Sequence, residues 1–309
     1  MPTAYAPGKA ILFGEHAVVY GQPAIAVPIG KVRACAVVSQ ARGGTGIVLS
    51  APDLKRTYPL SQAAPGDPLS AIVSNTLAHL GVTGHPDLTV TVTSTIPIAR
   101  GMGSGTAISV SIVRALVAHF GATLSDAEVS ALTFEVEKIY HGTPSGVDNT
   151  VVTYQKPVYF VKGQLVETLT VKTPFLLIVA DTGIASPTHV AVGDVGRKWQ
   201  CDREECEVIF DRIGAIARAA RQAIELGQPA KLGPLMNDNQ ALLQSLGVSS
   251  PELDRLIEVA VGAGAAGAKL SGAGCGGNII ALAPGTSASA VEKSLLVAGA
   301  KGVMVNEVS

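Results

Sequence analysis

A glycine-rich segment, two acids and a lysine are the parts of this chain whose residue types could act on a phosphate group. The segment reads Gly101-Met102-Gly103-Ser104-Gly105-Thr106-Ala107 and precedes an apolar stretch with helical spacing. Glycines let backbone N–H groups turn toward one point, and the N-terminus of a helix favours an anion. The segment therefore predicts a binding loop for a phosphorylated ligand. A tight turn, with glycines needed only for close packing, is the alternative.

Glu137 and Asp148 are acids on either side of a predicted turn. Ser125 and Glu128 have the spacing of a capping box, which predicts a helix that ends near Glu137. Asp148 follows a turn that contains glycine and proline. Phosphoryl transfer needs a metal ligand and a general base, and these two acids could supply them. The alternative is an ion-paired glutamate and a turn aspartate.

Two further segments combine glycines with polar residues. Lys9, Glu15 and His16 lie among glycines and apolar residues near the N-terminus. The lysine could neutralise a phosphoryl group, whereas a solvent-exposed charged face is the alternative. The second segment, residues 269–277, could bring its backbone close to a ligand or could form a tight turn.

Two common phosphate-binding motifs are excluded. The chain contains no Gly-x-x-x-x-Gly-Lys-Ser/Thr sequence, so a P-loop is unsupported. Residues 272–277 satisfy Gly-x-Gly-x-x-Gly, but residues 278–282 after them are typical of a strand. A dinucleotide-binding fold requires a helix at that point, so the motif lacks its structural context.

The elements that must position these residues indicate a mixed α/β (α+β) protein. The glycine segment lies between a predicted strand and a predicted helix, and further strands and one long helix follow. The residue pattern changes near residue 165, and we place a domain boundary there, with two domains that share a central cleft. The predicted strands are residues 88–93, 158–161 and 175–179, the long helix is residues 201–227, and the domains are residues 1–168 and 169–309.

Composition restricts the classes of protein and partner. The chain has 309 residues, is 47% hydrophobic and 15% charged, and has a formal net charge of -1. A globular protein with a small-molecule partner is expected, without nucleic acid or membrane as partners, because basic clusters and long apolar runs are absent. The N-terminus lacks the pattern of a signal peptide, so we expect a cytoplasmic protein. Four cysteines without metal-ligand spacing are expected to be free thiols, namely Cys35, Cys201, Cys206 and Cys275.

The motifs, in this order, resemble those of the GHMP kinases over nearly the whole chain. The two longest matches are residues 7–21 and residues 141–149. Both are most similar to the branch of the family that phosphorylates mevalonate. The resemblance implies ATP- and Mg²⁺-dependent phosphorylation of the C5 hydroxyl of mevalonate in isoprenoid biosynthesis. It also implies a two-domain fold with a left-handed β-α-β unit and a central cleft. The oligomeric state has no sequence signature, and a homodimer is one of the states open to the chain.

The resemblance also implies a role for individual residues. It implies a catalytic base with a cationic neighbour, a metal ligand, and a set of residues on the substrate side. It further implies an ATP-phosphate loop that is completed by the second glycine cluster. The residues are Asp148 and Lys9 for catalysis, Glu137 for the metal, Glu15, His16 and Thr188 for the substrate, and Gly101, Gly103, Ser104, Gly105, Thr106 and Gly274 for ATP.

The chain departs from the family pattern in the glycine segment. The usual motif is Gly-Leu-Gly-Ser-Ser-Ala-Ala-Tyr-Ser, whereas this chain has Gly105 at the second serine and Ile108 at the tyrosine. The second serine is expected to reach the magnesium ion. Ser104 or Thr106 could supply that hydroxyl, or water could fill the position, because Mg²⁺ commonly keeps several waters.

Two alternatives to this function stay open at the level of sequence. A related kinase could act on another small alcohol or on phosphomevalonate. A phosphorylated acceptor would require extra cations near the substrate residues, and Arg100 and Arg197 could supply them. A catalytically silent ligand sensor on the same fold is the other alternative, although retention of both Lys9 and Asp148 argues against it.

Overall fold

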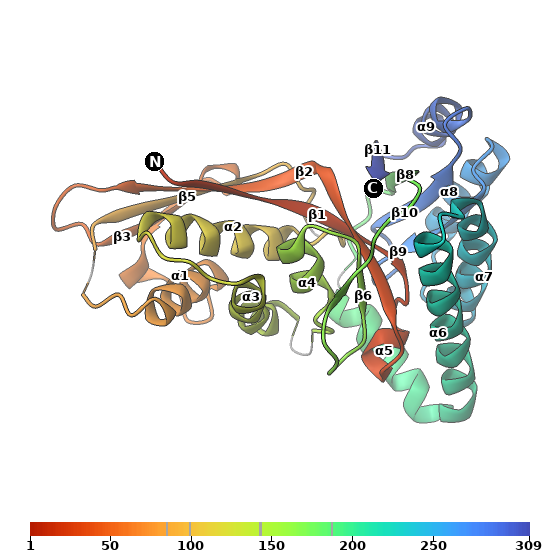
Figure 1. Cartoon of the computed structure of the whole chain (residues 1–309), viewed down its shortest axis with the longest axis horizontal. Helices are drawn as coiled ribbons and strands as arrows, with labels where there is room; N and C mark the ends of the chain where they lie inside the picture. Colours follow the sequence, from red (N-terminus) through yellow and green to blue (C-terminus); the bar gives the residue numbers. More distant parts are fainter. Residues whose placement is uncertain (85, 99, 142–143, 187) are drawn as a thin grey trace. The chain divides into compact units, whose positions relative to one another are not determined.

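The structure is a computed structural model in which residues 1–84, 86–98, 100–141, 144–186 and 188–309 are described (Figure 1). It is a mixed α/β protein with two compact units, as predicted. Unit 1 comprises Met1–Gly8, Val32–Pro97 and Gly103–Gln155, and unit 2 comprises Lys9–Lys31, Ile98–Met102 and Lys156–Ser309. The units are discontinuous because strands β1 (Thr3–Phe13) and β2 (Ala24–Gln40) contribute residues to both. The predicted domains, residues 1–168 and 169–309, are each one continuous segment, and this division stays a prediction.

Unit 1 is a sheet with helices on one face (Figure 1). Strand β5 pairs with β2 in antiparallel register and with β3 in parallel register, and β3 pairs with β4. Its inward residues Leu88, Val90 and Val92 are buried and alternate with threonines, which is why this segment forms a strand. The elements are β3 (Ile47–Ala51), β4 (Arg56–Pro59), β5 (Leu88–Ser94), α1 (Pro68–His79), α2 (Ser104–His119), α3 (Asp126–His141) and α4 (Val147–Tyr154).

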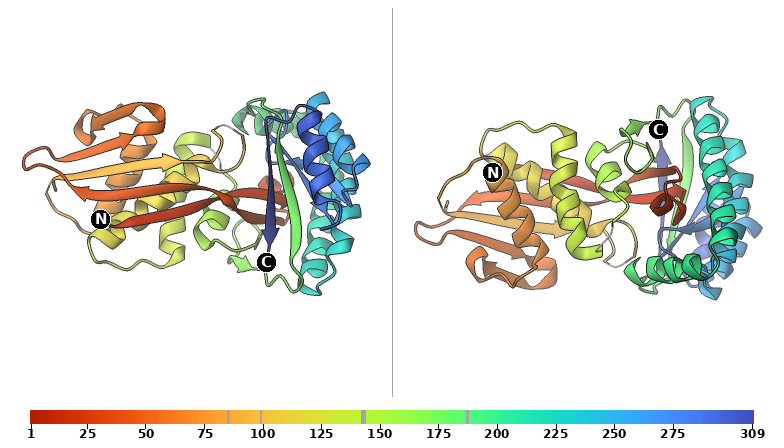
Figure 2. Two further views of the ribbon diagram at one scale, coloured as in Figure 1. Left: turned by 90° about the horizontal axis from the view of Figure 1, so that it is seen from above. Right: turned by 90° about the horizontal axis from the view of Figure 1, so that it is seen from below.

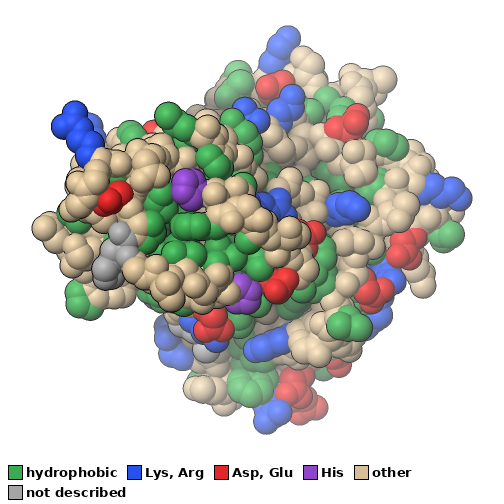
Figure 3. All heavy atoms as spheres, turned by 60° about the vertical axis from the view of Figure 1, so that its left-hand side comes forward, with side chains coloured by type: hydrophobic (Ala, Val, Ile, Leu, Met, Phe, Trp, Pro, Cys, Tyr) green, Lys and Arg blue, Asp and Glu red, His purple; other side chains and the backbone are tan. Residues whose placement is uncertain are grey.

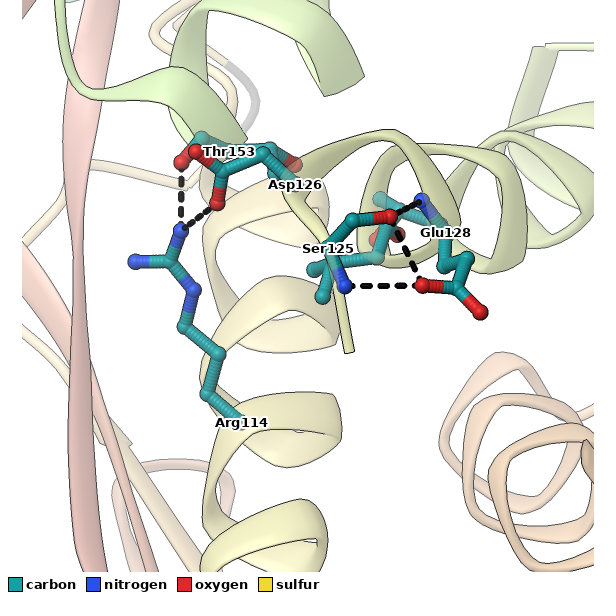
Figure 4. Close-up of polar contacts among 7 residues, drawn as sticks. Arg114, Ser125, Asp126, Glu128 and Thr153 are labelled. Carbon is teal, nitrogen blue, oxygen red and sulfur yellow. Dashed lines mark hydrogen bonds and ion pairs between the residues drawn. The ribbon is translucent and has the colours of Figure 1, made fainter. Parts of the chain in front are cut away.

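The predicted capping box at the start of α3 is confirmed (Figure 4). The backbone N–H of Ser125 donates to Glu128 Oε2 at 2.8 Å, and the backbone N–H of Glu128 donates to Ser125 Oγ at 3.3 Å. Close by, Arg114 Nη2 donates to Asp126 Oδ1 at 2.9 Å and to the carbonyl oxygen of Thr153 at 2.6 Å. One arginine of α2 therefore connects the start of α3 to the end of α4.

Unit 2 contains an antiparallel four-stranded sheet in the order β11-β8-β10-β9. Helices α6, α7, α8 and α9 lie on one side of this sheet (Figure 2). Asn278 begins strand β10, so the second glycine cluster precedes a strand and not a helix, as predicted. The elements are β6 (Val158–Phe160), β7 (Glu167–Thr168), β8 (Phe175–Asp181), β9 (Gly267–Ser271), β10 (Asn278–Ala283), β11 (Gly302–Val308), α5 (Thr188–Cys201), α6 (Arg203–Glu225), α7 (Leu232–Ser245), α8 (Pro251–Gly262) and α9 (Ala288–Val297).

The two faces of this sheet differ in polarity. Ala268 and Leu270 of β9 belong to the apolar core that the helices cover. Since side chains alternate along a strand, Lys269 and Ser271 point to the opposite face. That face carries the polar residues of the candidate site in unit 2.

Charged side chains of both signs lie on the surface. On the face drawn in Figure 3, basic and acidic side chains are interspersed. Within the described part of the chain, each helix is too short or too polar to cross a lipid bilayer. All four cysteines are free, as predicted.

Candidate functional site

The glycine segment forms a loop that leads into helix α2, so the predicted order of strand, loop and helix is confirmed. Gly101 and Gly103 have φ angles of 75° and 71°, in the left-handed region that favours glycine. Helix α2 begins at Ser104 with Gly103 as its N-cap. The predicted loop, which extended to Ala107, was therefore too long. Gly105 and Thr106 lie in the first turn of the helix, since the N–H of Ala107 already donates to the carbonyl oxygen of Gly103 at 2.9 Å.

Unit 1 brings two of the predicted site residues together. Thr106 Oγ1 donates to Glu137 Oε1 at 2.8 Å, and both side chains are buried. The proton of the hydroxyl is directed at the carboxylate, so its oxygen lone pairs remain available to another partner. Carboxylate and hydroxyl oxygens are ligands that hard divalent cations accept. Of the two hydroxyls considered from the sequence, Thr106 is the one that contacts Glu137, while Ser104 is half-buried at the start of α2.

A metal site made entirely of protein side chains is not present among the described residues. They contain no group of three or more His, Cys, Asp or Glu side chains arranged to hold a metal ion. Mg²⁺ in kinases is held by one or two protein ligands together with substrate phosphates and water. The Glu137 and Thr106 oxygens fit that smaller donor set.

Asp148 lies in the first turn of helix α4, whereas its sequence context predicted only a turn. Gly146 precedes the helix as its N-cap, with a φ of 96°. The helix buries the side chains of Val147, Val151 and Val152. The Nδ2 group of Asn149 donates to Ser130 Oγ at 2.8 Å and to the carbonyl oxygen of Ser130 at 3.3 Å. Helix α4 is thus anchored to α3 directly beside Asp148. Gly142 and Thr143 of the same motif lie outside the described residues.

Lys9 lies in unit 2, at the buried centre of strand β1. The residue is 4% exposed, and its backbone N–H donates to the carbonyl oxygen of Met102 at 3.0 Å. This bond ties β1 to the segment where the glycine loop begins. Asp148 lies in unit 1, whereas Lys9 lies in unit 2. That these two residues act together in catalysis stays a prediction.

Glu15 forms a buried ion pair with Lys269, a residue to which the sequence reasoning gave no role of its own. Lys269 Nζ donates to Glu15 Oε1 and to the carbonyl oxygen of Leu270, and the two paired side chains are 0% and 1% exposed. Burial raises the pKa of Glu15 and lowers that of Lys269, and the attraction between the two charges opposes both shifts. A lysine within an otherwise buried strand was the signal for such a pair, because an isolated buried charge is too costly.

His16 is held beside this pair as a neutral imidazole. Its Nε2–H donates to the carbonyl oxygen of Ala273 at 2.9 Å, and its backbone has a φ of 60°. Burial lowers the pKa of His16 to about 4. Nδ1 is buried, and no hydrogen-bond partner for it occurs among the described residues. With Nε2 as the donor, Nδ1 of the neutral imidazole is a hydrogen-bond acceptor.

We expect His16 to make the folded protein less stable as the pH falls from 6.5 to 4. Its pKa in the folded state is below its ordinary value, so the unfolded chain binds the proton more readily in this window. The loss should reach about 3 kcal/mol by pH 4. Urea unfolding of wild type and His16→Gln between pH 7 and pH 4 measures it, with His119→Gln as the control for removing a histidine elsewhere. A stability difference between wild type and His16→Gln that stays constant over this range would contradict the expectation.

Gly274 and the segment before Thr188 meet in unit 2. Gly274 has a φ of 79°, and a Cβ atom on it would lie 2.0 Å from the carbonyl oxygen of Val248. Close packing alone therefore requires glycine here. Ser186 Oγ donates to the carbonyl oxygen of Gly274, while Thr188 begins α5 and is half-buried. Pro187 lies outside the described residues.

Comparisons with known proteins agree on one family. A model described as GHMP kinases N terminal domain matches residues 69–156, and another, GHMP kinases C terminal, matches residues 220–298. The mevalonate kinase of Aeropyrum pernix is 39% identical over 290 residues, which cover 90% of this chain and 87% of that protein.

Solved structures extend the likeness to the whole fold. The crystal structure of L. major mevalonate kinase in complex with R-mevalonate has a TM-score of 0.84 at 30% identity, with 100% of this chain and 96% of that chain covered. The Streptococcus pneumoniae phosphomevalonate kinase in complex with phosphomevalonate and AMPPNP has a TM-score of 0.83 at 17% identity, with 99% and 100% covered. At that identity the likeness concerns the fold alone. These matches confirm the predicted two-domain α/β fold.

Proposed function

This chain belongs to the GHMP kinase family, and we propose that it transfers the γ-phosphoryl group of ATP to the C5 hydroxyl of mevalonate. The observation that carries the proposal is similarity along nearly the whole chain to mevalonate kinases, one of them a structure with R-mevalonate. The buried polar residues of both units support it, because each has a place in phosphoryl transfer.

Asp148 and Lys9 are proposed to act on the reacting groups. A primary alcohol has a pKa far above neutrality, so orientation and charge neutralisation contribute more than early deprotonation. Asp148 accepts the hydroxyl proton late, as the bond from the alcohol oxygen to the γ-phosphorus forms and the bond to ADP breaks. Lys9 stabilises the negative charge on the transferring group. Glu15, His16 and Thr188 are proposed to hold the acceptor.

The backbone of the glycine loop is proposed to bind the ATP phosphates. N–H groups at the start of α2 favour an anion. Gly274, from the second glycine cluster, is proposed to contribute to the same ATP site. The residues proposed for ATP are Gly101, Gly103, Ser104, Gly105, Thr106 and Gly274. Glu137, with Ser104 or Thr106, is proposed to hold Mg²⁺, which neutralises phosphate charge when bound.

We expect Thr106→Ala to raise the Mg²⁺ concentration needed for half-maximal activity by about tenfold, and Ser104→Ala to change it less. The reason is that the Thr106 hydroxyl contacts Glu137, and loss of an outer partner of a metal ligand typically costs about 10–100-fold in affinity. Activity measured against free Mg²⁺ at saturating ATP compares the two variants. An unchanged titration in both would favour water at this position.

An acceptor that already carries a phosphate is less well supported. Arg197 pairs with Asp194 and is 71% exposed, while Arg100 pairs with Asp181. Both cations considered for such an acceptor thus have acidic partners, and a dianionic acceptor needs cations that are not neutralised.

A coupled assay of ADP release tests the proposed function. Purified protein is given ATP, Mg²⁺ and, in turn, mevalonate, phosphomevalonate, homoserine or galactose. ADP release with mevalonate at a kcat/KM at least about 100-fold above the other three is the expected result. Preference for another acceptor would replace the proposed substrate, and no release with any of them would favour a ligand sensor. The homodimer and the cytoplasmic location stay predictions.

A further inference from the structure

A row of polar residues crosses the sheet of unit 2 at the last residues of β9 and β8 and the first residue of β10. Asn278 is the register partner of Ser271 on one side and of Asp181 on the other. Register partners on neighbouring antiparallel strands point to the same face of a sheet. The face in question is the one opposite the helices, where Lys269 also lies.

Each residue of this polar row holds a segment that carries a proposed site residue. Ser271 Oγ donates to the carbonyl oxygen of Ile11 and accepts from its N–H, both at 3.0 Å, which fixes β1 two residues beyond Lys9. Asn278 Nδ2 donates to the carbonyl oxygen of Arg100. Asp181 Oδ2 lies 3.4 Å from Arg100 Nε.

The backbone is therefore held at Arg100 and at Met102, on either side of Gly101, the first glycine of the loop. The carbonyl oxygen of Arg100 accepts from Asn278, and that of Met102 accepts from the N–H of Lys9. Asn278 is 3% exposed, so water cannot easily replace its amide. The backbone also approaches Gly277 closely, since a Cβ on that glycine would lie 3.2 Å from the carbonyl oxygen of Arg100.

We propose that Asn278 and Asp181 are positioning residues for ATP, which act by fixing Arg100 in the conformation that starts the phosphate loop. Asn278 fixes the backbone of Arg100, and Asp181 fixes its side chain. Neither needs to contact the nucleotide. The inference rests on the proposed kinase function, because that function gives the loop its ligand.

The variants Asn278→Ala and Asp181→Asn test the two contacts. Asp181→Asn keeps a carbonyl oxygen that can accept from the N–H of Gly183, a bond now 2.8 Å long, and removes only the charge that faces Arg100. Asn306→Ala is the matched control. Asn306 is also a buried amide in unit 2, but its Oδ1 accepts from the N–H of Gly30 at 3.1 Å and its Nδ2 donates to the carbonyl oxygens of Pro28 and Glu307, so its hydrogen bonds do not involve Arg100.

Steady-state kinetics with ATP and mevalonate, together with direct titration of ATP·Mg²⁺ in the absence of mevalonate, give the readouts. In Asn278→Ala we expect the KM and the dissociation constant for ATP to rise about tenfold, with the KM for mevalonate within about twofold of wild type. Asp181→Asn should show the same pattern with a smaller rise. In the double variant, the dissociation constant for ATP should rise by less than the product of the two single increases, because both residues hold Arg100.

The outcomes separate this inference from the proposed function. If wild type phosphorylates mevalonate but ATP affinity is unchanged in both variants, the inference is wrong and the function stands. The inference is also wrong if Asn306→Ala weakens ATP binding as much as Asn278→Ala does, or if the KM values for ATP and mevalonate rise together. Either result would indicate a general loss of stability in unit 2. If wild type binds ATP but does not act on mevalonate, the proposed function fails while the titration still tests the positioning role.

Discussion

Replacing Asp148 with Asn is expected to lower kcat for mevalonate about 10³-fold and to leave the affinity for ATP within about twofold of wild type. The amide has nearly the same shape as the carboxylate but cannot accept the proton of the C5 hydroxyl. Helix α4 should stay in place, because the substitution retains the hydrogen bond from Asn149 to Ser130 that anchors the helix to α3. Loss in kcat without loss of ATP affinity is the signature of a group that acts in the transition state.

Rapid-quench or coupled-assay kinetics measure kcat, and titration with ATP·Mg²⁺ measures the affinity. Asp126→Asn is the matched control, since Asp126 is also an acid in the first turn of a helix of unit 1 and pairs with Arg114 (Figure 4). Its kcat should stay within about threefold of wild type, as exposed ion pairs contribute little. A kcat near that of wild type in Asp148→Asn would remove Asp148 from the role of base.

Replacing Lys269 with Met is expected to lower the free energy of unfolding by about 3–5 kcal/mol at pH 7. The Glu15 carboxyl would keep its burial but lose the charged donor that offsets it. A methionine has a similar length and can fill the space of the lysine stem, so the loss would reflect charge more than volume. Urea unfolding of the purified variant measures the change through the midpoint and the m value.

Two comparisons identify the cause of that loss. The double variant Lys269→Met with Glu15→Gln removes both charges and should recover at least about half of the lost stability. Lowering the pH should also reduce the deficit of the single variant. Without Lys269, burial raises the pKa of Glu15 further above its unfolded value, so stability is lost as the pH rises through the folded pKa and is regained below it. A deficit that is independent of pH, with no recovery in the double variant, would contradict this account.

Local elements of this protein were predictable because their signals are local. The alternation of Leu88, Val90 and Val92 predicted β5, and the spacing of Ser125 and Glu128 predicted the start of α3, since side chains two or three residues apart decide both. Helix α4 was missed because its start at Gly146 resembles a turn, and its burial depends on packing against α3.

The site residues divide in the same way. Residue types and order identified the glycine loop, Glu137 and Asp148 as candidates, and resemblance to a family gave them roles. The contacts of Thr106 with Glu137 and of Lys269 with Glu15 join residues 31 and 254 positions apart, so no local pattern specified them.

The sequence by itself determined the family, the mixed α/β class and the candidate residues, because motif identity and hydrophobic period are properties of neighbouring positions. The tertiary structure alone decided which hydroxyl reaches Glu137, which lysine is buried against Glu15, and that Asn278 holds the start of the glycine loop. The physical reason is burial: a charge or amide removed from water must find its partner in space, and that partner is set by the packing of whole elements.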